Sequence, residues 1–198
     1  VIHESAKNIS KVLGRSSKIY NNVIKGLSRH DLSELKKNKK QISKLSSEVD
    51  NLKDKLFYFI KNLDESSLGA SNFYINLLGY LQDITQSMEY ISKVSLKHIN
   101  NNHSKLTLNQ IRDLLDIQKV IAEVFESISL AFANKSFSDI KTILKDNNKT
   151  IGLLEDKIKT QISRTRTSEE KSPKNAALYF GILQESKDLM KEVMNLIE

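Results

Sequence analysis

Acidic residues at one-turn spacing are the side chains of this sequence that could do chemistry. Asp188 and Glu192 are four residues apart, and so are Asp50 and Asp54. On a helix this spacing places two carboxylates on one face, where their oxygens could reach one hard divalent cation. On a helical wheel Glu185 falls within about 60° of Asp188 and Glu192, on the side away from the apolar seam. A metal site and a solvated, mutually repulsive acidic surface are both compatible with this pattern.

A catalytic apparatus is not recognisable in the sequence. None of the four histidines pairs at metalloprotease spacing, because His98 and His103 are five residues apart. The chain has no cysteine nucleophile, no glycine-rich phosphate loop and no G-x-S-x-G motif, which are the usual local signs of nucleophilic or phosphoryl chemistry. We therefore predict that the protein is not an enzyme.

Helices must position these side chains. One proline and six glycines in 198 residues leave few interruptions, and apolar residues recur at spacings of three, four and seven, which is the helical period. The expected helices cover about residues 2–27, 31–63, 70–100, 107–133, 136–166 and 172–197.

Capping residues stand at three of the expected helix starts. Asp31 can accept a backbone N–H at the start of the second helix. Thr107 with Gln110 fits a capping box. Ser172 before Pro173 suits an N-cap followed by a proline in the first helical position, where its missing N–H costs nothing.

Segments of the first half return in the second half in the same order. The pairs are LLGYLQD and YFGILQE (77–83, 179–185), LKDKL and LEDKI (52–56, 154–158), and DLSELK and SFSDIK (31–36, 136–141). The first two pairs are 102 residues apart and the third 105. Shared apolar spacing between any two amphipathic helices is the alternative explanation. Segments that recur in one order at nearly one offset predict that the two halves of the chain arose by duplication.

The predicted fold is all-α, with two tandem antiparallel three-helix bundles. The polar run at residues 100–104 is the expected boundary, because asparagine and serine disfavour helix interiors. It divides the chain into residues 1–102 and 103–198. The echo also places Gly79 and Gly181 in the middle of helices, where glycine costs roughly 1 kcal/mol relative to alanine. We expect a neighbouring helix to approach closely at both glycines; a notch that faces a ligand is the alternative.

The charge balance favours anionic partners. The formal net charge is +7 and the pI about 9.4, which suits nucleic acid, anionic lipid or phosphate. The densest basic run is Lys36, Lys37, Lys39 and Lys40, and a solvated helix face is its plain explanation. Nucleic acid is disfavoured because aromatic and basic residues are not interleaved and no recognition motif is present.

Several stretches resemble known phosphate-control proteins. The ending MNLIE at 194–198 is similar to the closing phrase of third helices in the PhoU family of tandem three-helix bundles. A further set resembles the cytoplasmic tail of Pit-type inorganic phosphate transporters of some bacteria, essentially over the whole chain. This set comprises residues 1–8, 74–83, 97–103, 164–167 and 172–175.

The resemblance implies a regulatory domain on the cytoplasmic side of the bacterial inner membrane. The partner would be the transmembrane transporter part of the same chain or a cytosolic protein. Because residue 1 is valine rather than methionine, we expect membrane segments upstream. The lysine-rich face would lie near anionic lipid, where each basic residue is worth about 1 kcal/mol. A homodimer is compatible on base rates alone.

The family resemblance also implies a divalent-metal motif, an acid-x-x-x-acid pair in each half. The third helix departs from it: Asp83 and Glu89 lie about 120° apart on the wheel, and Thr85 stands where a partner of Glu89 would be expected. A complete two-site cluster is therefore not expected. A structural array of spectrin-like three-helix repeats is the alternative to a phosphate role. Such repeats join through one continuous helix, against which residues 100–102 and the Thr107 cap argue.

Overall fold

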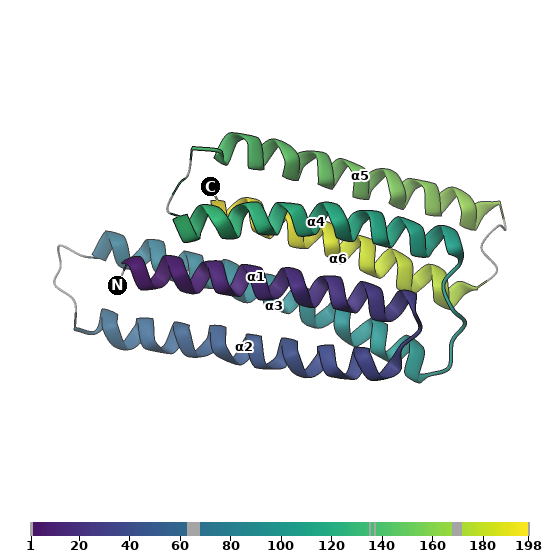
Figure 1. The fold of residues 1–198 in the computed structure, drawn as a ribbon, viewed down its shortest axis with the longest axis horizontal. Coiled ribbons are helices and arrows are strands. Elements are labelled where there is room, and N and C mark those ends of the chain that lie inside the picture. The colour runs from purple at the N-terminus through teal and green to yellow at the C-terminus, as the bar shows by residue number, and fades with distance from the viewer. Residues whose placement is uncertain (1, 63–67, 135, 137, 168–171, 198) are drawn as a thin grey trace.

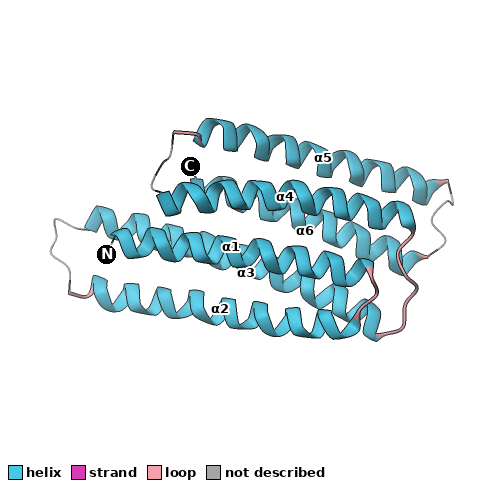
Figure 2. Ribbon diagram, viewed as in Figure 1, coloured by secondary structure: helices cyan, strands magenta, loops and turns pink. Residues whose placement is uncertain are grey.

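Six long antiparallel helices make up the structure, a computed structural model that describes residues 2–62, 68–134, 136, 138–167 and 172–197 (Figure 1). Over these residues the chain forms helices, turns and loops but no strand (Figure 2). The helices are α1 (Ile2–Ser28), α2 (Leu32–Ile60), α3 (Leu68–Asn100), α4 (Leu108–Asn134), α5 (Ile140–Arg166) and α6 (Pro173–Ile197). The predicted all-α fold with three helices in each half is confirmed.

The predicted caps form the expected hydrogen bonds. Asp31 Oδ1 accepts the backbone N–H three residues on, at 3.0 Å. The Gln110 N–H donates to Thr107 Oγ1 at 3.2 Å, and the Thr107 N–H donates to Gln110 Oε1 at 3.0 Å, which completes the capping box. Ser172 Oγ accepts the N–H of Asn175 at 3.2 Å. Each cap satisfies a backbone donor that the helix itself leaves unpaired.

One predicted helix start differs from the structure, and one predicted helix end falls on a residue that the structure does not describe. The expected start at Ser136 is wrong, because α5 begins at Ile140. The Ser136 N–H instead donates to Ala131 O at 3.1 Å and closes the turn that follows α4. The second helix ends at Ile60, and its expected end at residue 63 lies outside the described residues.

The two halves pack side by side around one core. α1 contacts α4, and α3 contacts α6, whereas α2 and α5 lie at opposite edges of the molecule (Figure 1). Buried apolar residues from all six helices form one cluster. α3 and α4 are separate helices joined through residues 101–107, unlike the continuous helix of a spectrin-like array. The division of the chain at residues 102 and 103 stays a prediction.

Small residues bring α1 and α4 together. Ser10 and Ser129 each donate a hydroxyl hydrogen bond to the other's carbonyl oxygen, both at 2.9 Å. A Cβ added at Gly14 would lie 3.7 Å from Ser129 Oγ. Between α1 and α6 the buried hydroxyls of Tyr20 and Ser186 lie 2.8 Å apart. Polar contacts between the halves are therefore paired where α1 crosses α4 and where it reaches α6.

Burial repeats between the halves at two offsets. At 105 residues many of the buried positions of α1 match buried positions of α4, and several of α2 match buried positions of α5, although Leu13, Ile24 and Leu35 have half-buried counterparts. The pairs are Ile9/Leu114, Val12/Ile117, Ile19/Val124, Tyr20/Phe125, Val23/Ile128, Ile42/Asn147, Leu45/Thr150 and Val49/Leu154. The echo of residues 52–56 at 154–158 is out of this register by three residues. In α3 and α6 the offset of 102 holds, for example at Leu77/Tyr179 and Leu81/Leu183.

Candidate functional site

The acids of α6 lie beside α3 rather than on an outer face. Glu192 is half-buried, and its carboxyl lies close enough to that of Asp83 on α3 for the two charges to interact. Burial raises the pKa of Glu192, and the negative charges of Asp83 and Asp188 raise it further, while a hydrogen bond with Asn195 lowers it. Because α3 packs against α6, the acids that the helical wheel places away from the apolar seam are half-buried rather than fully exposed.

Glu185 belongs to the same group of acids. Burial raises the pKa of Glu185 and the charge of Asp188 adds to that rise, whereas a hydrogen bond with Ser87 on α3 opposes it. We call Asp83, Glu185, Asp188 and Glu192 the acidic cluster. Glu185, Asp188 and Glu192 are half-buried and Asp83 is exposed. Their negative charges repel one another, so an outside cation would be stabilised there.

The other predicted acids lie elsewhere. Asp50 on α2 accepts a hydrogen bond from Gln82 Nε2 at 2.9 Å, and Lys53 Nζ donates to Gln82 Oε1 at 3.0 Å. Asp54 is exposed and Glu89 half-buried. The structure therefore brings Asp83, Glu185, Asp188 and Glu192 together and leaves the remaining three acids outside this cluster.

A metal ion finds no ligand set in the described part of the chain. No group of three or more histidine, cysteine, aspartate or glutamate side chains there is arranged to hold one. Thr85, which stands in the expected acidic position of the third helix, is buried and donates its hydroxyl to Gln82 O at 2.8 Å. The expectation of a divalent metal therefore gains no support, and we derive no step through one.

The two echoed glycines have different surroundings. A Cβ added at Gly79 would meet nothing within 4 Å, so the predicted close approach of a helix there is wrong. A Cβ at Gly181 would lie 3.5 Å from the hydroxyl oxygen of Tyr90 on α3. Gly181 thus lies against a neighbouring side chain, whereas Gly79 lies at the surface side of its helix. The sequence motif that Gly79 and Gly181 share therefore does not correspond to a shared contact.

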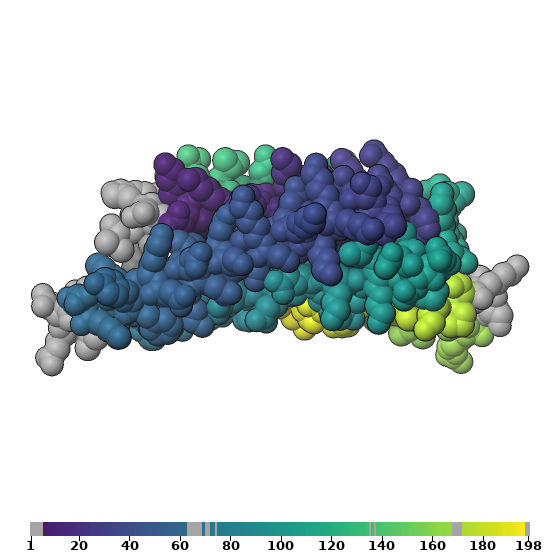
Figure 3. Space-filling view, turned by 90° about the horizontal axis from the view of Figure 1, so that it is seen from below, coloured from purple at the N-terminus to yellow at the C-terminus, as the bar shows by residue number. Residues whose placement is uncertain are grey.

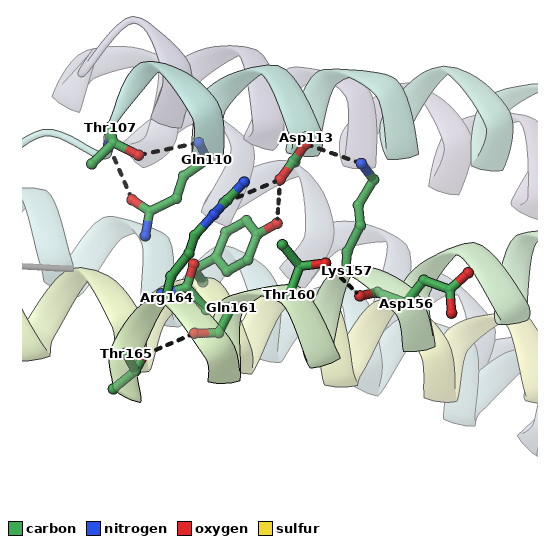
Figure 4. A network of polar contacts seen from close by, with 10 residues as sticks. Thr107, Gln110, Asp113, Asp156, Lys157, Thr160, Gln161, Arg164 and Thr165 are labelled. Carbon is green, nitrogen blue, oxygen red and sulfur yellow. Dashed lines mark hydrogen bonds and ion pairs between the residues drawn. The ribbon is translucent and has the colours of Figure 1, made fainter. Parts of the chain in front are cut away.

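A polar network centred on Asp113 ties α4, α5 and α6 together (Figure 4). Asp113 Oδ1 accepts from Lys157 Nζ at 3.0 Å, and Oδ2 accepts from the Tyr179 hydroxyl at 2.9 Å. Arg164 Nη1 lies 3.6 Å from Oδ2. Burial, together with the nearby Asp113 carboxylate, raises the pKa of Tyr179. Sequence reasoning missed this network, because its members lie 44 to 66 residues from Asp113 along the chain.

The fold defines a class of all-α protein in which two three-helix halves pack side by side on a common core. Among solved structures, the chain is similar to "phosphate transport system regulatory protein PhoU from Streptococcus pneumoniae". The TM-score is 0.76 at 14% identity, over 100% of this chain and 91% of that one. At this identity the likeness shows the fold.

Comparison of the sequence with protein families and with curated proteins found no match. No protein-family model matches the chain, and no curated protein matches it. Among the described helices none is both long and apolar enough to cross a membrane.

Proposed function

We propose that the chain regulates phosphate transport in the manner of a PhoU-like protein. The observation that carries the proposal is the structural likeness over the whole chain to a protein named as a phosphate transport system regulator. Helix order, side-by-side halves and a common core agree with that fold. The finer proposal is that the chain belongs to a Pit-type transporter and docks on its membrane part, at the cytoplasmic side of the inner membrane. The sequence resemblance supports this finer assignment.

The acidic cluster offers a docking point for a cationic partner segment. The carboxylates of Glu192 and Asp83 lie close enough for their negative charges to repel each other. A lysine or arginine from a partner would relieve this repulsion and could form charge-assisted hydrogen bonds with both carboxylates. Regulation follows if the partner presents that cation in only one of its transport states, because a binder shifts only the equilibria that it distinguishes.

The test is phosphate uptake in the native bacterium. Deletion of the segment that encodes residues 1–198 should abolish the dependence of radiolabelled phosphate uptake on external phosphate. The double variant Asp83→Asn/Glu192→Gln should weaken this dependence, whereas Asp50→Asn/Asp54→Asn, which removes the same charge at exposed positions, should leave it unchanged. Uptake that stays under normal control after the deletion would refute a phosphate role and favour a structural interaction module.

A further inference from the structure

A basic groove runs between α1 and α2. It has a volume of about 590 Å³ and is lined by three cations of α1, namely Lys11, Arg15 and Lys18, and by Lys55 of α2. Glu48 is the one acid among its lining residues, so four cations and one carboxylate give a formal net charge of +3. Figure 3 looks onto α2 and shows α1 along one side of it and α3 along the other.

Three of the four cations in this groove have no partner among the residues that the structure describes. Arg15 forms an ion pair with Glu48. Lys11, Lys18 and Lys55 are exposed, and none of them makes an ion pair or hydrogen bond with another described residue. Three ammonium groups around one guanidinium in a concave surface reinforce one another's field. Such an arrangement costs the free protein self-repulsion and would be stabilised by an anion.

A groove of the second half partly corresponds in position to the basic groove but has different chemistry. At the offset of 105 residues the two linings share three positions, namely 15/120, 18/123 and 48/153. This second groove lies between α4 and α5, also measures about 590 Å³, and is lined by Glu123, Asp146 and Lys149. At the offset of 105 residues that matches burial in α1 and α4, Lys18 corresponds to Glu123. The positive charge is therefore a property of the first groove and not a consequence of the fold.

Two further positions of α1 also differ in charge from the equivalent positions of α4. Asp113 corresponds to Asn8, and Asp116 corresponds to Lys11. Asn8 and Lys11 both line the basic groove. From residue 5 to residue 30 the chain carries six lysines and arginines and no acid. At these two positions α4 carries carboxylates, of which Asp113 pairs with Lys157, whereas α1 carries an amide and a cation.

We propose that the groove between α1 and α2 binds a ligand through phosphate groups. Ammonium groups bind phosphoryl oxygens as point charges, and a guanidinium binds two oxygens at once. The side-chain amides of Asn8 and Asn51, which also line the groove, can donate further hydrogen bonds. A volume of about 590 Å³ lies in the range of small-molecule sites, and three exposed ammonium groups suit a chain of two or three phosphates. Glu48 competes with such a ligand for Arg15.

The phosphate groups could belong to a free molecule or to a lipid headgroup. The probes are inorganic phosphate, pyrophosphate and tripolyphosphate in calorimetric titration, and vesicles of phosphatidylglycerol in phosphatidylcholine in co-sedimentation. All measurements use the whole chain at fixed, near-physiological salt, because nonspecific charge attraction falls with ionic strength. Binding of tripolyphosphate assigns a free ligand, and binding of vesicles alone assigns a headgroup.

The variants separate the groove from total charge. Lys11→Gln/Lys18→Gln/Lys55→Gln should weaken binding by at least about tenfold, the scale of one lost charge-assisted contact. The matched control Lys36→Gln/Lys39→Gln/Lys40→Gln removes the same charge from exposed positions on α2 and should change it by less than about twofold. Glu48→Gln should tighten binding, because it frees Arg15.

Two results would overturn the proposal. One is equal weakening by both triple variants, which would mean that only net charge matters. The other is failure of the wild-type chain to bind any of the probes. Thermal melts check that the variants fold, and Lys55→Gln alone serves if the triple variant does not. The proposal depends on the groove alone, so it stands or falls separately from the role in phosphate transport.

Discussion

Replacing Asp113 by alanine should cost about 3 kcal/mol of unfolding free energy. The substitution removes the acceptor of Lys157 and of the Tyr179 hydroxyl and the ion pair with Arg164. A hydrogen bond to a charged group contributes about 1.5–3 kcal/mol and a neutral one about 1 kcal/mol. The side chains of Asp113 and Lys157 are 19% and 18% exposed, so the loss falls at the lower end of the roughly 3–5 kcal/mol found when a fully buried pair is broken.

The assay is chemical and thermal denaturation followed by circular dichroism. For 198 residues, an unfolding entropy of about 2.1 cal/mol/K per residue converts 3 kcal/mol into a fall in Tm of about 7 °C. Asp116→Ala is the matched control, since Asp116 is exposed one turn along the same helix; it should change stability by less than about 0.5 kcal/mol. A double-mutant cycle with Tyr179→Phe should give a coupling energy of about 1 kcal/mol.

Equal effects of Asp113→Ala and Asp116→Ala would refute this reasoning. They would mean that water satisfies Lys157 and Arg164 once the carboxylate is gone. A coupling energy near zero with Tyr179→Phe would remove the hydroxyl from the network even if Asp113 itself proved important.

The remaining predictions concern titration and backbone conformation. Burial raises the pKa of the Tyr20 hydroxyl, although the contact with Ser186 opposes this rise. The stability that the protonated hydroxyl contributes is therefore complete below about pH 10 and falls above pH 10 by up to about 1.4 kcal/mol per pH unit. Alkaline denaturation of Tyr20→Phe should be less steep than that of the wild-type chain. Because the pKa of Glu192 is raised in the fold, its protonated form stabilises the protein below the ordinary pKa of glutamate, and this stability is lost as pH rises. Glu192→Gln should therefore stabilise the protein by on the order of 0.5 kcal/mol at pH 7. The same substitution should have no effect near pH 4 in denaturant titrations. His30 follows α1 with φ of 54°, a conformation that glycine adopts more readily, so His30→Gly should stabilise by about 0.5–1 kcal/mol in the same assay; a loss of stability would show that the imidazole has a role of its own.

Local sequence signals predicted the six helices and the starts of α2, α4 and α6. The capping box at Thr107 and Gln110 involves residues three apart, and both of its hydrogen bonds form. The start of α5 was misplaced because Ser136 is used by the end of α4 instead. Such competition between two adjoining helix ends cannot be decided from capping preferences alone, since one residue can serve either helix.

Contacts between helices were not predictable from the sequence. A helical wheel places Glu192 correctly relative to its own apolar seam but cannot say that Asp83 of α3 covers its flank. The same limit applies to Gly79, which shares a phrase with Gly181 but not a neighbour. For the Asp113 network no local pattern exists, because each pairing crosses between helices.

Surfaces that gather charges of one sign indicate where this chain binds its partners. Folding alone favours pairing, as it does for Asp113 with Lys157 in the second half. The acidic cluster and the basic groove do the opposite: each gathers like charges that weaken the isolated protein and that only a partner of opposite sign can relieve. Because the second half has a groove of the same size without net positive charge, the fold does not require this arrangement. If neutralising the groove lysines stabilises the chain and also removes phosphate binding, the repulsion is retained for the ligand; if it stabilises the chain and binding persists, the charge serves another surface.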